Sequence, residues 1–274
     1  MSVWSYGGKR VAIVGCYSGM GEAAARELVR LGAEVHGFDV CESSVAMASF
    51  KAIDLRDPSS IDSAVASISG EIDALFNCAG LPQTFPPLDV MKVNYIGMRY
   101  LTERMLPKIR PGGAIAIISS TAGMGYMQHA AEIGDLIANT SFDEAVAWCV
   151  RHPDLVQDGY TFSKEVSSFW TMFMGMHTIQ RGVRINCICP GPTDTPMMPN
   201  FESAASKAVI DVFTKPIGRR SRAEEQAYPL IFLNSDAASY INGHVFNIDG
   251  GFVGGVMSGQ IDVMAEVGKA MAPA

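Results

Sequence analysis

The sequence predicts an α/β fold: a doubly wound parallel sheet with helices on both faces, giving three α/β/α layers. Two observations support this prediction. Short β-branched apolar segments alternate with segments of helical periodicity, the order that a parallel sheet with crossover helices requires. The chain has 274 residues, of which 48% are hydrophobic, and these values suit a large domain with a substantial core. We therefore expect residues 1–274 to form a single domain.

The first strand, turn and helix predict a dinucleotide site. Residues 9–14 (KRVAIV) have the pattern of a buried strand, a glycine turn follows at residues 15–21, and residues 22–31 have helical periodicity. Such a turn directs free backbone N–H groups and a helix N-terminus at a pyrophosphate. A plain turn is the alternative for this segment alone. The turn residues expected to contact the cofactor are Gly15, Tyr17, Ser18, Gly19, Met20 and Gly21.

An acidic residue ends the second predicted strand, residues 34–38. Asp39 lies about 20 residues beyond the glycine turn, where a carboxylate can accept hydrogen bonds from the adenosine ribose. It also disfavours a 2′-phosphate, since two unit charges about 5 Å apart at an effective dielectric of 20 repel by roughly 3 kcal/mol. No Lys or Arg follows in residues 40–42. We predict NAD(H) over NADP(H); a solvated turn aspartate is the alternative.

The later segments continue the alternation. The predicted fourth strand ends in Asn77-Cys78-Ala79-Gly80, where small residues let the backbone pass close to a flat ligand. Ser119-Ser120 and Pro190-Gly191 follow two further strands, at the sheet edge where such folds bind ligands. We expect strands at residues 52–55, 71–76, 114–118 and 183–188, and helices at residues 58–68 and from 160 onward.

Tyr160-Thr161-Phe162-Ser163-Lys164 predicts an acid/base. Residues four apart share a helix face, so the phenol of Tyr160 and the ammonium of Lys164 are expected side by side. A neighbouring cation favours the phenolate and would lower the pKa of Tyr160 from its usual value near 10. Such a phenol could exchange a proton with an alcohol or ketone near neutral pH. In isolation the pattern also fits a surface Tyr beside a solvated Lys.

A set of motifs now occurs in a fixed order. The glycine turn, Asn77-Cys78-Ala79-Gly80, Val93-Asn94-Tyr95-Ile96-Gly97, Ile118-Ser119-Ser120, Tyr160-x-x-x-Lys164, Cys189-Pro190-Gly191-Pro192-Thr193-Asp194-Thr195 and Asp249-Gly250-Gly251 succeed one another. This ordered set resembles the short-chain dehydrogenase/reductase family, with its Rossmann-type fold, over roughly residues 8–252. Val14 stands where the family usually has Thr, which removes one side-chain hydrogen bond near the turn.

The resemblance implies residue roles. Tyr160 would be the acid/base, Ser120 would hydrogen-bond the substrate oxygen, and Lys164 would lower the pKa of Tyr160 and hold the nicotinamide ribose. Asn94 would bend its helix and anchor a water, whereas Ser119 would be structural. Thr195 and the backbone at Thr193 would hold the carboxamide. Beyond the turn and Asp39, the implied cofactor-binding residues are Asp54, Leu55, Asn77, Ala79, Gly80, Tyr160, Lys164, Pro190, Gly191, Thr193 and Thr195.

Two segments depart from the ordinary family pattern. Ser120 and Tyr160 lie 40 residues apart, and the additional segment, about residues 127–158, predicts two helices, the second starting with the capping box Ser141-x-x-Glu144. The insertion resembles that of the 3α-hydroxysteroid dehydrogenase/carbonyl reductase-like group. It could cover a subunit interface, roof the pocket, or do both. The tail at residues 252–274 could close the pocket or clasp a partner subunit.

Substrate clues come from residues around the expected pocket. Thioether side chains adapt to bulky apolar ligands, although core methionines are the alternative explanation. No Lys or Arg stands in these segments, which disfavours an acidic or phosphorylated substrate. The expected pocket residues are Ser120, Met124, Met127, Met197, Met198 and Phe201.

Composition excludes several partners. The net charge of −7 and the lack of any Lys/Arg run argue against nucleic acid or an anionic membrane. Scattered cysteines and the absence of a signal-peptide pattern in residues 1–10 predict a cytoplasmic protein with reduced thiols. No metal is expected, because Cys187-x-Cys189 has no accompanying His or second Cys pair, although a site there stays open.

We therefore expect an NAD(H)-dependent oxidoreductase that interconverts a secondary alcohol and a ketone on a bulky, largely apolar substrate, steroid-like, cyclic or aromatic. A homodimer or homotetramer is expected. The alternatives are a non-enzymatic NAD-binding sensor, and a dehydrogenase of a small cyclic alcohol or diol. An epimerase or dehydratase would need a longer substrate domain, and an enoyl reductase would space its Tyr and Lys more widely.

Overall fold

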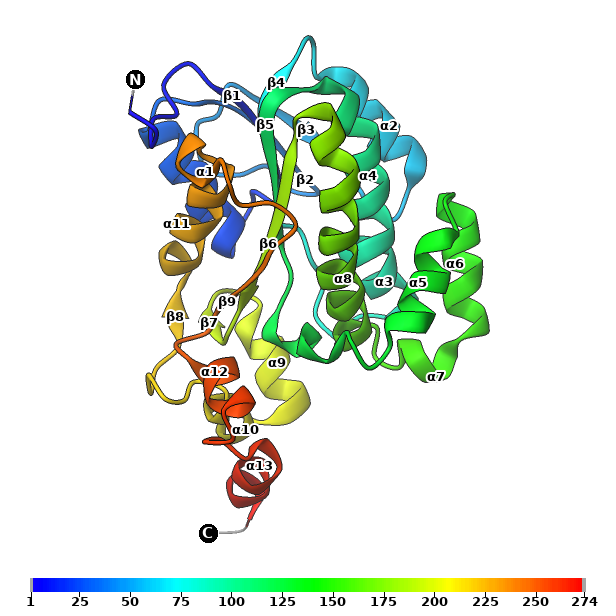
Figure 1. The fold of residues 1–274 in the computed structure, drawn as a ribbon, viewed down its shortest axis with the longest axis vertical. Coiled ribbons are helices and arrows are strands. Elements are labelled where there is room, and N and C mark those ends of the chain that lie inside the picture. The colour runs from blue at the N-terminus through cyan, green and yellow to red at the C-terminus, as the bar shows by residue number, and fades with distance from the viewer. Residues whose placement is uncertain (1, 273–274) are drawn as a thin grey trace.

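Seven parallel strands form the central sheet of the computed structural model, which describes residues 2–272 (Figure 1). Their spatial order is β3-β2-β1-β4-β5-β6-β9, and each neighbouring pair is parallel. The chain begins at β1, winds outward through β2 and β3, and crosses back to β4, so the predicted doubly wound topology is confirmed. The strands are β1 (Arg10–Val14), β2 (Glu34–Asp39), β3 (Ser49–Ala52), β4 (Ile72–Asn77), β5 (Ile109–Ile118), β6 (Arg184–Pro190) and β9 (Val245–Ile248).

Helices cover both faces of this sheet (Figure 1). On one face α1 (Gly19–Arg30) packs against α11 (Ala223–Asn234), and their apolar residues form one core with β1 and β4. On the other face, α2 (Pro58–Ser67), α4 (Met98–Met105) and α8 (Tyr160–Thr178) form a second core. Because both faces are buried, β6 shows no alternation of buried and exposed residues: every residue is buried, including the polar Arg184 and Asn186.

Several of the remaining elements follow the carboxyl ends of the strands. α3 (Pro87–Met91) runs into a π-helical turn, η1 (Lys92–Gly97), and then into α4. β7 (Thr193–Asp194) pairs with β8 (Ser221–Arg222), and the segment between them carries α9 (Met198–Ala205) and α10 (Lys207–Val212), hereafter the lid. Short 3₁₀ turns are η2 (Leu106–Lys108), η3 (Thr121–Gly125), η4 (Ile179–Arg181) and η5 (Asp236–Ala238).

The insertion forms three helices, α5 (Ala130–Ala138), α6 (Phe142–Arg151) and α7 (Pro153–Val156). The predicted capping box is present: Ser141 Oγ accepts from Glu144 N, and the Glu144 carboxylate accepts from Ser141 N. The apolar face of α6 is buried, with Trp148 1% exposed, and it packs against α3, η1 and α5. The insertion therefore lies beside α8, on the outer side of the second core.

The C-terminal tail forms α12 (Phe252–Met257) and α13 (Val263–Met271), with residues 273–274 outside the described part. α13 packs against α10 of the lid, where Lys215 and Glu266 form an ion pair. The Phe252 ring lies 5.1 Å from the Phe213 ring, centroid to centroid. The tail thus contacts the lid from outside. Within residues 2–272, no helix has the length and apolarity that a membrane crossing requires.

Several predicted boundaries are wrong. β5, for example, begins at Ile109, five residues before the predicted start. The third strand is Ser49–Ala52 instead of residues 52–55, because β3 is a mostly exposed edge strand and carries no apolar signal. Ile53 and Leu55, the apolar residues that suggested a strand, are buried in the turn that follows it. α1 begins at Gly19, so the last residues of the glycine turn belong to the helix.

Candidate active site

A cavity of about 350 Å³ lies at the carboxyl ends of β1, β2, β3 and β4, where a doubly wound sheet binds ligands. Its walls come from the segments that directly follow these strands. Most of the predicted adenosine and pyrophosphate residues meet here although they are far apart in sequence. The predicted cofactor residues that line it are Gly15, Tyr17, Ser18, Asp39, Asp54, Leu55, Ala79 and Gly80.

Close backbone approach explains the glycines of the turn. Gly15 has φ +86°, and a Cβ there would lie 2.3 Å from the backbone nitrogen of Ala79. A Cβ on Gly21 would lie 1.8 Å from the Gly15 oxygen. Ser18, the residue before α1, makes no side-chain capping bond to the helix, and the first N–H groups of a helix have no intrahelical acceptor. These features fit a bound pyrophosphate.

Asp39 faces this cavity and is fixed by two backbone groups. Its Oδ2 accepts a hydrogen bond from Tyr17 N (2.9 Å), and its Oδ1 accepts one from Val40 N (2.7 Å). Lone pairs on both oxygens stay available to ribose hydroxyls. One cation lines the cavity, Arg56, but its guanidinium is already bound to Asp54 at 2.8 Å. The charges therefore favour a ribose without a 2′-phosphate.

A second cavity of about 360 Å³ adjoins the first, since Met197 lines both. It lies between the ends of β5 and β6, the start of α8, and the lid. The named lining residues include none with a charged side chain. They are Met20, Ser119, Ser120, Thr121, Ala122, Met124, Tyr160, Thr161, Pro190, Gly191, Pro192, Thr193, Thr195, Met197, Met198, Phe201, Ile210 and Phe213.

Tyr160 and Ser120 meet in this second cavity. Tyr160 is the first residue of α8, and Ser120 follows the last residue of β5. Phe201 of the lid packs edge-on against the Tyr160 ring, with centroids 5.1 Å apart. Burial raises the pKa of Tyr160 to about 12, although a hydrogen bond with Ser120 acts in the opposite direction. The phenol is therefore protonated at neutral pH.

Lys164 lies one turn further along α8, and its Nζ is 5.7 Å from the centroid of the Tyr160 ring. The ammonium donates to the backbone oxygen of Ile118 at 3.0 Å, and burial lowers the pKa of Lys164 to about 8. The expectation that this cation lowers the pKa of Tyr160 is therefore not met in this structure. Burial of both groups dominates, because desolvation disfavours the charged form of each.

Asn94 lies in the π-helical turn η1, so the predicted irregularity of its helix is present. Its Oδ1 accepts from Leu81 N (2.7 Å), and its Nδ2 donates to Leu81 O (3.0 Å) and Ser163 Oγ (3.1 Å). A Cβ on Gly80 would meet Asn94 Oδ1 at 3.4 Å and Lys164 Nζ at 3.8 Å. Asn94 and Lys164 therefore flank the same point of the backbone.

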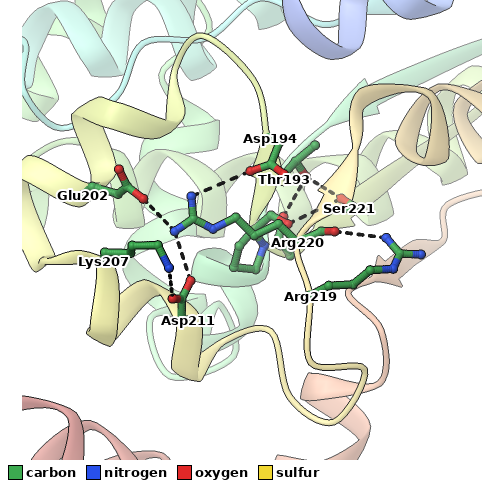
Figure 2. A network of polar contacts seen from close by, with 10 residues as sticks. Thr193, Asp194, Glu202, Lys207, Asp211, Arg219, Arg220 and Ser221 are labelled. Atoms are coloured by element: carbon green, nitrogen blue, oxygen red, sulfur yellow. Dashed lines mark hydrogen bonds and ion pairs between the residues drawn. The ribbon is translucent and has the colours of Figure 1, made fainter.

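An ion-pair network holds the lid (Figure 2). The guanidinium of Arg220, just before β8, contacts Glu202 of α9 at 2.7 Å, Asp211 of α10 at 3.0 Å and Asp194 of β7 at 3.7 Å. The side chain of Arg220 is only 13% exposed. One cation thus connects both lid helices to β7.

Two predicted site residues lie elsewhere. Asn77 does not line either cavity: its Nδ2 donates to Thr102 Oγ1 (2.9 Å), and its side chain is buried behind the cavity wall. Met127 is 66% exposed and lies outside the substrate cavity. The residues that line the two cavities also do not include Gly19, Gly21 or Lys164. Gly19 lies against Thr195, since a Cβ there would lie 3.3 Å from the Thr195 methyl.

Sequence reasoning missed several lining residues. Arg56 directly follows the predicted Asp54-Leu55, so its position in sequence could have indicated it. Val40 and Val93 adjoin Asp39 and Asn94 in the same way. Residues of the insertion, 127–158, do not line the substrate cavity, so a pocket-roofing role has no support here. Among residues 2–272, no group of three or more His, Cys, Asp or Glu side chains is arranged to hold a metal ion.

Known proteins resemble this chain over most of its length. The sequence model of a family described as "Enoyl-(Acyl carrier protein) reductase" matches residues 15–253. Coniferyl-alcohol dehydrogenase of Pseudomonas sp. (strain HR199 / DSM 7063) is 34% identical over 247 residues, 89% of this chain and 96% of the relative. The 3-alpha-hydroxysteroid dehydrogenase/carbonyl reductase of Comamonas testosteroni is 31% identical over 253 residues, 88% and 95% of the two chains.

A solved structure agrees with these sequence matches. The 3-alpha-hydroxysteroid dehydrogenase of Pseudomonas sp. B-0831, complexed with NADH, superimposes with a TM-score of 0.78 and 26% identity, covering 92% of this chain and 100% of that one. Matched length, fold and identity lead to the same conclusion. The chain belongs to the short-chain dehydrogenase/reductase family of oxidoreductases.

Proposed function

We propose that this protein is an NAD(H)-dependent oxidoreductase that interconverts an alcohol and a carbonyl group on a bulky, largely apolar substrate. The observation that carries the proposal is the second cavity, where the hydroxyl groups of Tyr160 and Ser120 meet within a wall rich in Met and Phe. With no charge on the named lining side chains, an apolar substrate with one reacting oxygen fits better than an acid or a phosphate.

The residues act on a proton and on the substrate oxygen. Tyr160 gives its proton to a carbonyl oxygen during reduction and accepts the alcohol proton during oxidation. Ser120 hydrogen-bonds the same oxygen and orients it toward the phenol. Lys164 and Asn94 provide the polar boundary behind Tyr160 and hold a water between them. The nicotinamide supplies or accepts the hydride when it is bound.

The first cavity supports NAD(H) as the cofactor. Asp39 accepts two backbone N–H groups and presents its remaining lone pairs to the cavity, and the nearby Arg56 is neutralised by Asp54. The solved relative from Pseudomonas sp. B-0831 was complexed with NADH. Thr195 and the backbone at Thr193 then hold the carboxamide, because both line the second cavity near the glycine turn.

Changing Asp39 tests the cofactor assignment. Asp39→Ser removes the charge but keeps a hydrogen-bonding side chain. The ratio of kcat/KM for NADP(H) over NAD(H) should rise about 100-fold, because roughly 3 kcal/mol of repulsion is removed. Glu42→Gln, an exposed acid three residues further on, is the control and should leave the ratio unchanged. Wild-type preference for NADP(H) would contradict the role of Asp39.

The relatives suggest two kinds of ring-bearing substrate. One relative is named for coniferyl alcohol and another for 3-alpha-hydroxysteroids and carbonyl compounds. Aryl alcohols and alicyclic alcohols both fit a cavity of about 360 Å³ lined by thioether and phenyl groups. A small cyclic alcohol or diol is a second candidate, and it would leave much of this apolar wall without contact.

Two other functions remain as outcomes of the test. An NAD-binding sensor should lack one of the reacting groups, yet Asn94, Ser120, Tyr160 and Lys164 are all present and face one region. The description of the matching family model names an enoyl reductase. In this chain, however, Tyr160 and Lys164 are only four residues apart, which is one helical turn. That spacing favours carbonyl chemistry.

A substrate panel tests the proposal. NADH fluorescence is followed with steroid, monocyclic and aryl carbonyl compounds, and with an enoyl thioester as a separate arm. We expect decay with ring-bearing carbonyl compounds and the reverse reaction with the matching alcohols and NAD⁺. NADH binding without consumption in any arm would indicate a sensor. Decay with the enoyl thioester alone would replace our proposal by an enoyl reductase.

We also propose a cytoplasmic homodimer or homotetramer formed from a single-domain chain. Six free thiols fit a reducing compartment, and the exposed apolar side chains of Phe173 and Met176 on α8 fit a contact between subunits. Gel filtration with light scattering measures the assembly, and a monomer at micromolar concentration would refute it.

A further inference from the structure

Ser120 is flanked by two side chains that tie the end of β5 to other parts of the site. Before it, Ser119 Oγ donates to the backbone oxygen of Lys164 at 2.9 Å. After it, Thr121 Oγ1 donates to the backbone oxygen of Pro190 at 3.2 Å. The two neighbours of Ser120 are therefore bonded to α8, which carries Tyr160, and to the last residue of β6.

The Ser119 contact belongs to a longer chain of polar groups. Ser168 Oγ lies 2.8 Å from Ser119 Oγ, and Cys189 Sγ lies 3.7 Å from Ser168 Oγ. Since the Ser119 proton goes to Lys164 O, Ser168 is left to donate to Ser119. The thiol of Cys189 can then donate to Ser168. This order satisfies each hydroxyl with one donor and one acceptor role.

The members of this chain are buried and distributed over three elements. Ser119 follows β5, Ser168 lies on α8, and Cys189 lies on β6, with exposures of 2%, 0% and 2%. Each is next to, or one helical turn from, a residue of the site: Ser119 before Ser120, Cys189 before Pro190, and Ser168 after Lys164. At Ser168, which is fully buried and lines neither cavity, bulk water cannot replace a lost hydroxyl.

Backbone packing at Gly123 supports the same junction from the other side. A Cβ on Gly123 would lie 2.5 Å from the carbonyl carbon of Lys164 and 2.8 Å from Glu165 N. The turn η3 therefore rests directly on the backbone of α8 at Lys164. The ammonium of Lys164 meanwhile returns to the Ile118 oxygen. Contacts to residues 118, 119 and 123 thus converge on Lys164 from both sides of Ser120.

We propose that Ser119, Ser168 and Cys189 form a buried clamp that positions Ser120 relative to Tyr160 and Lys164. The clamp rests on the proposed alcohol–carbonyl activity, and its members are positioning residues that do not themselves react. Reacting groups must be held within roughly 0.5 Å of productive geometry, and a misplacement of about 1 Å can cost on the order of 100-fold in rate. Loss of the clamp should therefore reduce turnover more than binding.

Ser168→Ala is the most direct test, because Ser168 lines neither cavity. With the best carbonyl substrate, kcat should fall about 10- to 100-fold, while KM and the Kd of NADH from a fluorescence titration stay within about threefold. Ser235→Ala is the matched control: Ser235 is 1% exposed, and its hydroxyl donates to Phe232 O, three residues earlier. It should lose similar stability and keep its kcat.

A pair of variants at Cys189 separates positioning from packing. Cys189→Ser keeps a donor and should retain kcat within about threefold, whereas Cys189→Ala removes the donor and should lose about tenfold or more. Equal kcat for Ser168→Ala and Ser235→Ala would overturn the proposal, as would a rise in KM at constant kcat.

A crystal structure of Ser168→Ala gives a readout that does not depend on activity. Displacement of Ser120 Oγ relative to Lys164 by about 0.5 Å or more is expected, and an unmoved Ser120 would overturn the clamp. Wild-type protein that oxidises no alcohol would count against the proposed function alone.

Discussion

Tyr160 and Lys164 show how burial changes the chemistry that their spacing suggests. The two side chains lie on one face of α8, as residues four apart must, but the ammonium turns to the Ile118 oxygen. Burial then raises the pKa of Tyr160 to about 12 and lowers that of Lys164 to about 8. In this arrangement Tyr160 is a ready proton donor at neutral pH, and it becomes a proton acceptor only as pH rises.

This pKa predicts opposite pH dependences for the two directions. Alcohol oxidation needs deprotonated Tyr160, whose fraction increases with pH below the pKa, so log kcat/KM should climb between pH 7 and 10. Carbonyl reduction needs the protonated phenol, so its kcat/KM should stay nearly flat over this range.

Tyr160→Phe should lower kcat about 10³-fold in both directions, while the affinity for NADH stays within a few-fold. Retained turnover in this variant would remove Tyr160 from the mechanism.

At the scale of elements, the lid is the segment whose position depends most on charge. Arg220 is bound by three carboxylates from β7, α9 and α10 (Figure 2). Replacing it would remove the cation that Asp194 and Glu202 share and would leave Asp211 paired with Lys207 alone. Phe201 of the lid packs against the Tyr160 ring and forms part of the apolar wall of the substrate cavity. Substrate binding should therefore depend on this one guanidinium.

Arg220→Met should raise KM for an apolar substrate about tenfold with a smaller change in kcat, because the open lid loses apolar contact area. Arg219→Met is the matched control. The Arg219 side chain is 54% exposed and pairs with Glu225 of α11, outside the lid. Steady-state kinetics on both variants makes the comparison, and equal KM values would show that the network does not hold the lid.

The insertion is a second element with its own stability argument. Trp148 of α6 is 1% exposed, donates from Nε1 to Asp135 at 2.6 Å and stacks on His152. Trp148→Ala should lower the free energy of unfolding by about 3–5 kcal/mol, as large-to-small core changes do. Activity per folded molecule should stay within about threefold, because the insertion does not line the cavity.

Urea unfolding followed by circular dichroism measures this change. Val150→Ala, on the same helix at a position 61% exposed, is the control and should shift stability by no more than about 0.5 kcal/mol. If Trp148→Ala loses activity far beyond threefold under conditions where it is fully folded, the insertion contributes directly to the site.

At the scale of the whole molecule, one sheet joins two cores. Trp148 and Trp170 belong to the core that contains α8, whereas Trp4 contacts Phe232 of α11 on the opposite face. Because the seven strands are shared by both cores, neither face can unfold and leave the other intact. The chain should therefore unfold as one cooperative unit.

Two probes test this cooperativity. Tryptophan fluorescence of Trp4→Phe reports only the core with α8, and far-UV circular dichroism reports all elements. The two urea transitions should coincide in midpoint and slope. Separate transitions would instead divide the chain into two folding units.

The sequence alone determined the parallel, doubly wound sheet and the segments that carry the candidate site, because these depend on local patterns. Buried strands carry continuous apolar residues, and residues that follow parallel strands meet at one edge, so Asp39, Ser120 and Pro190 could be placed together. Edge strand β3 was misplaced because an exposed strand has no such pattern. Asn77 and Met127 line neither cavity, because a side chain's direction depends on its packing partners.

Only the tertiary structure decided where the insertion lies, how the lid is held and which way each pKa moves. The helical pattern around Trp148 is compatible with burial against several surfaces. In the folded chain this residue is buried in the core beside α8. The pKa of Tyr160 depends on its burial, to which residues distant in sequence, such as Phe201, contribute. The spacing of residues along one helix carries no information about that burial. Local periodicity fixes neighbours within a turn, whereas desolvation and long-range contacts arise only when the whole chain has packed.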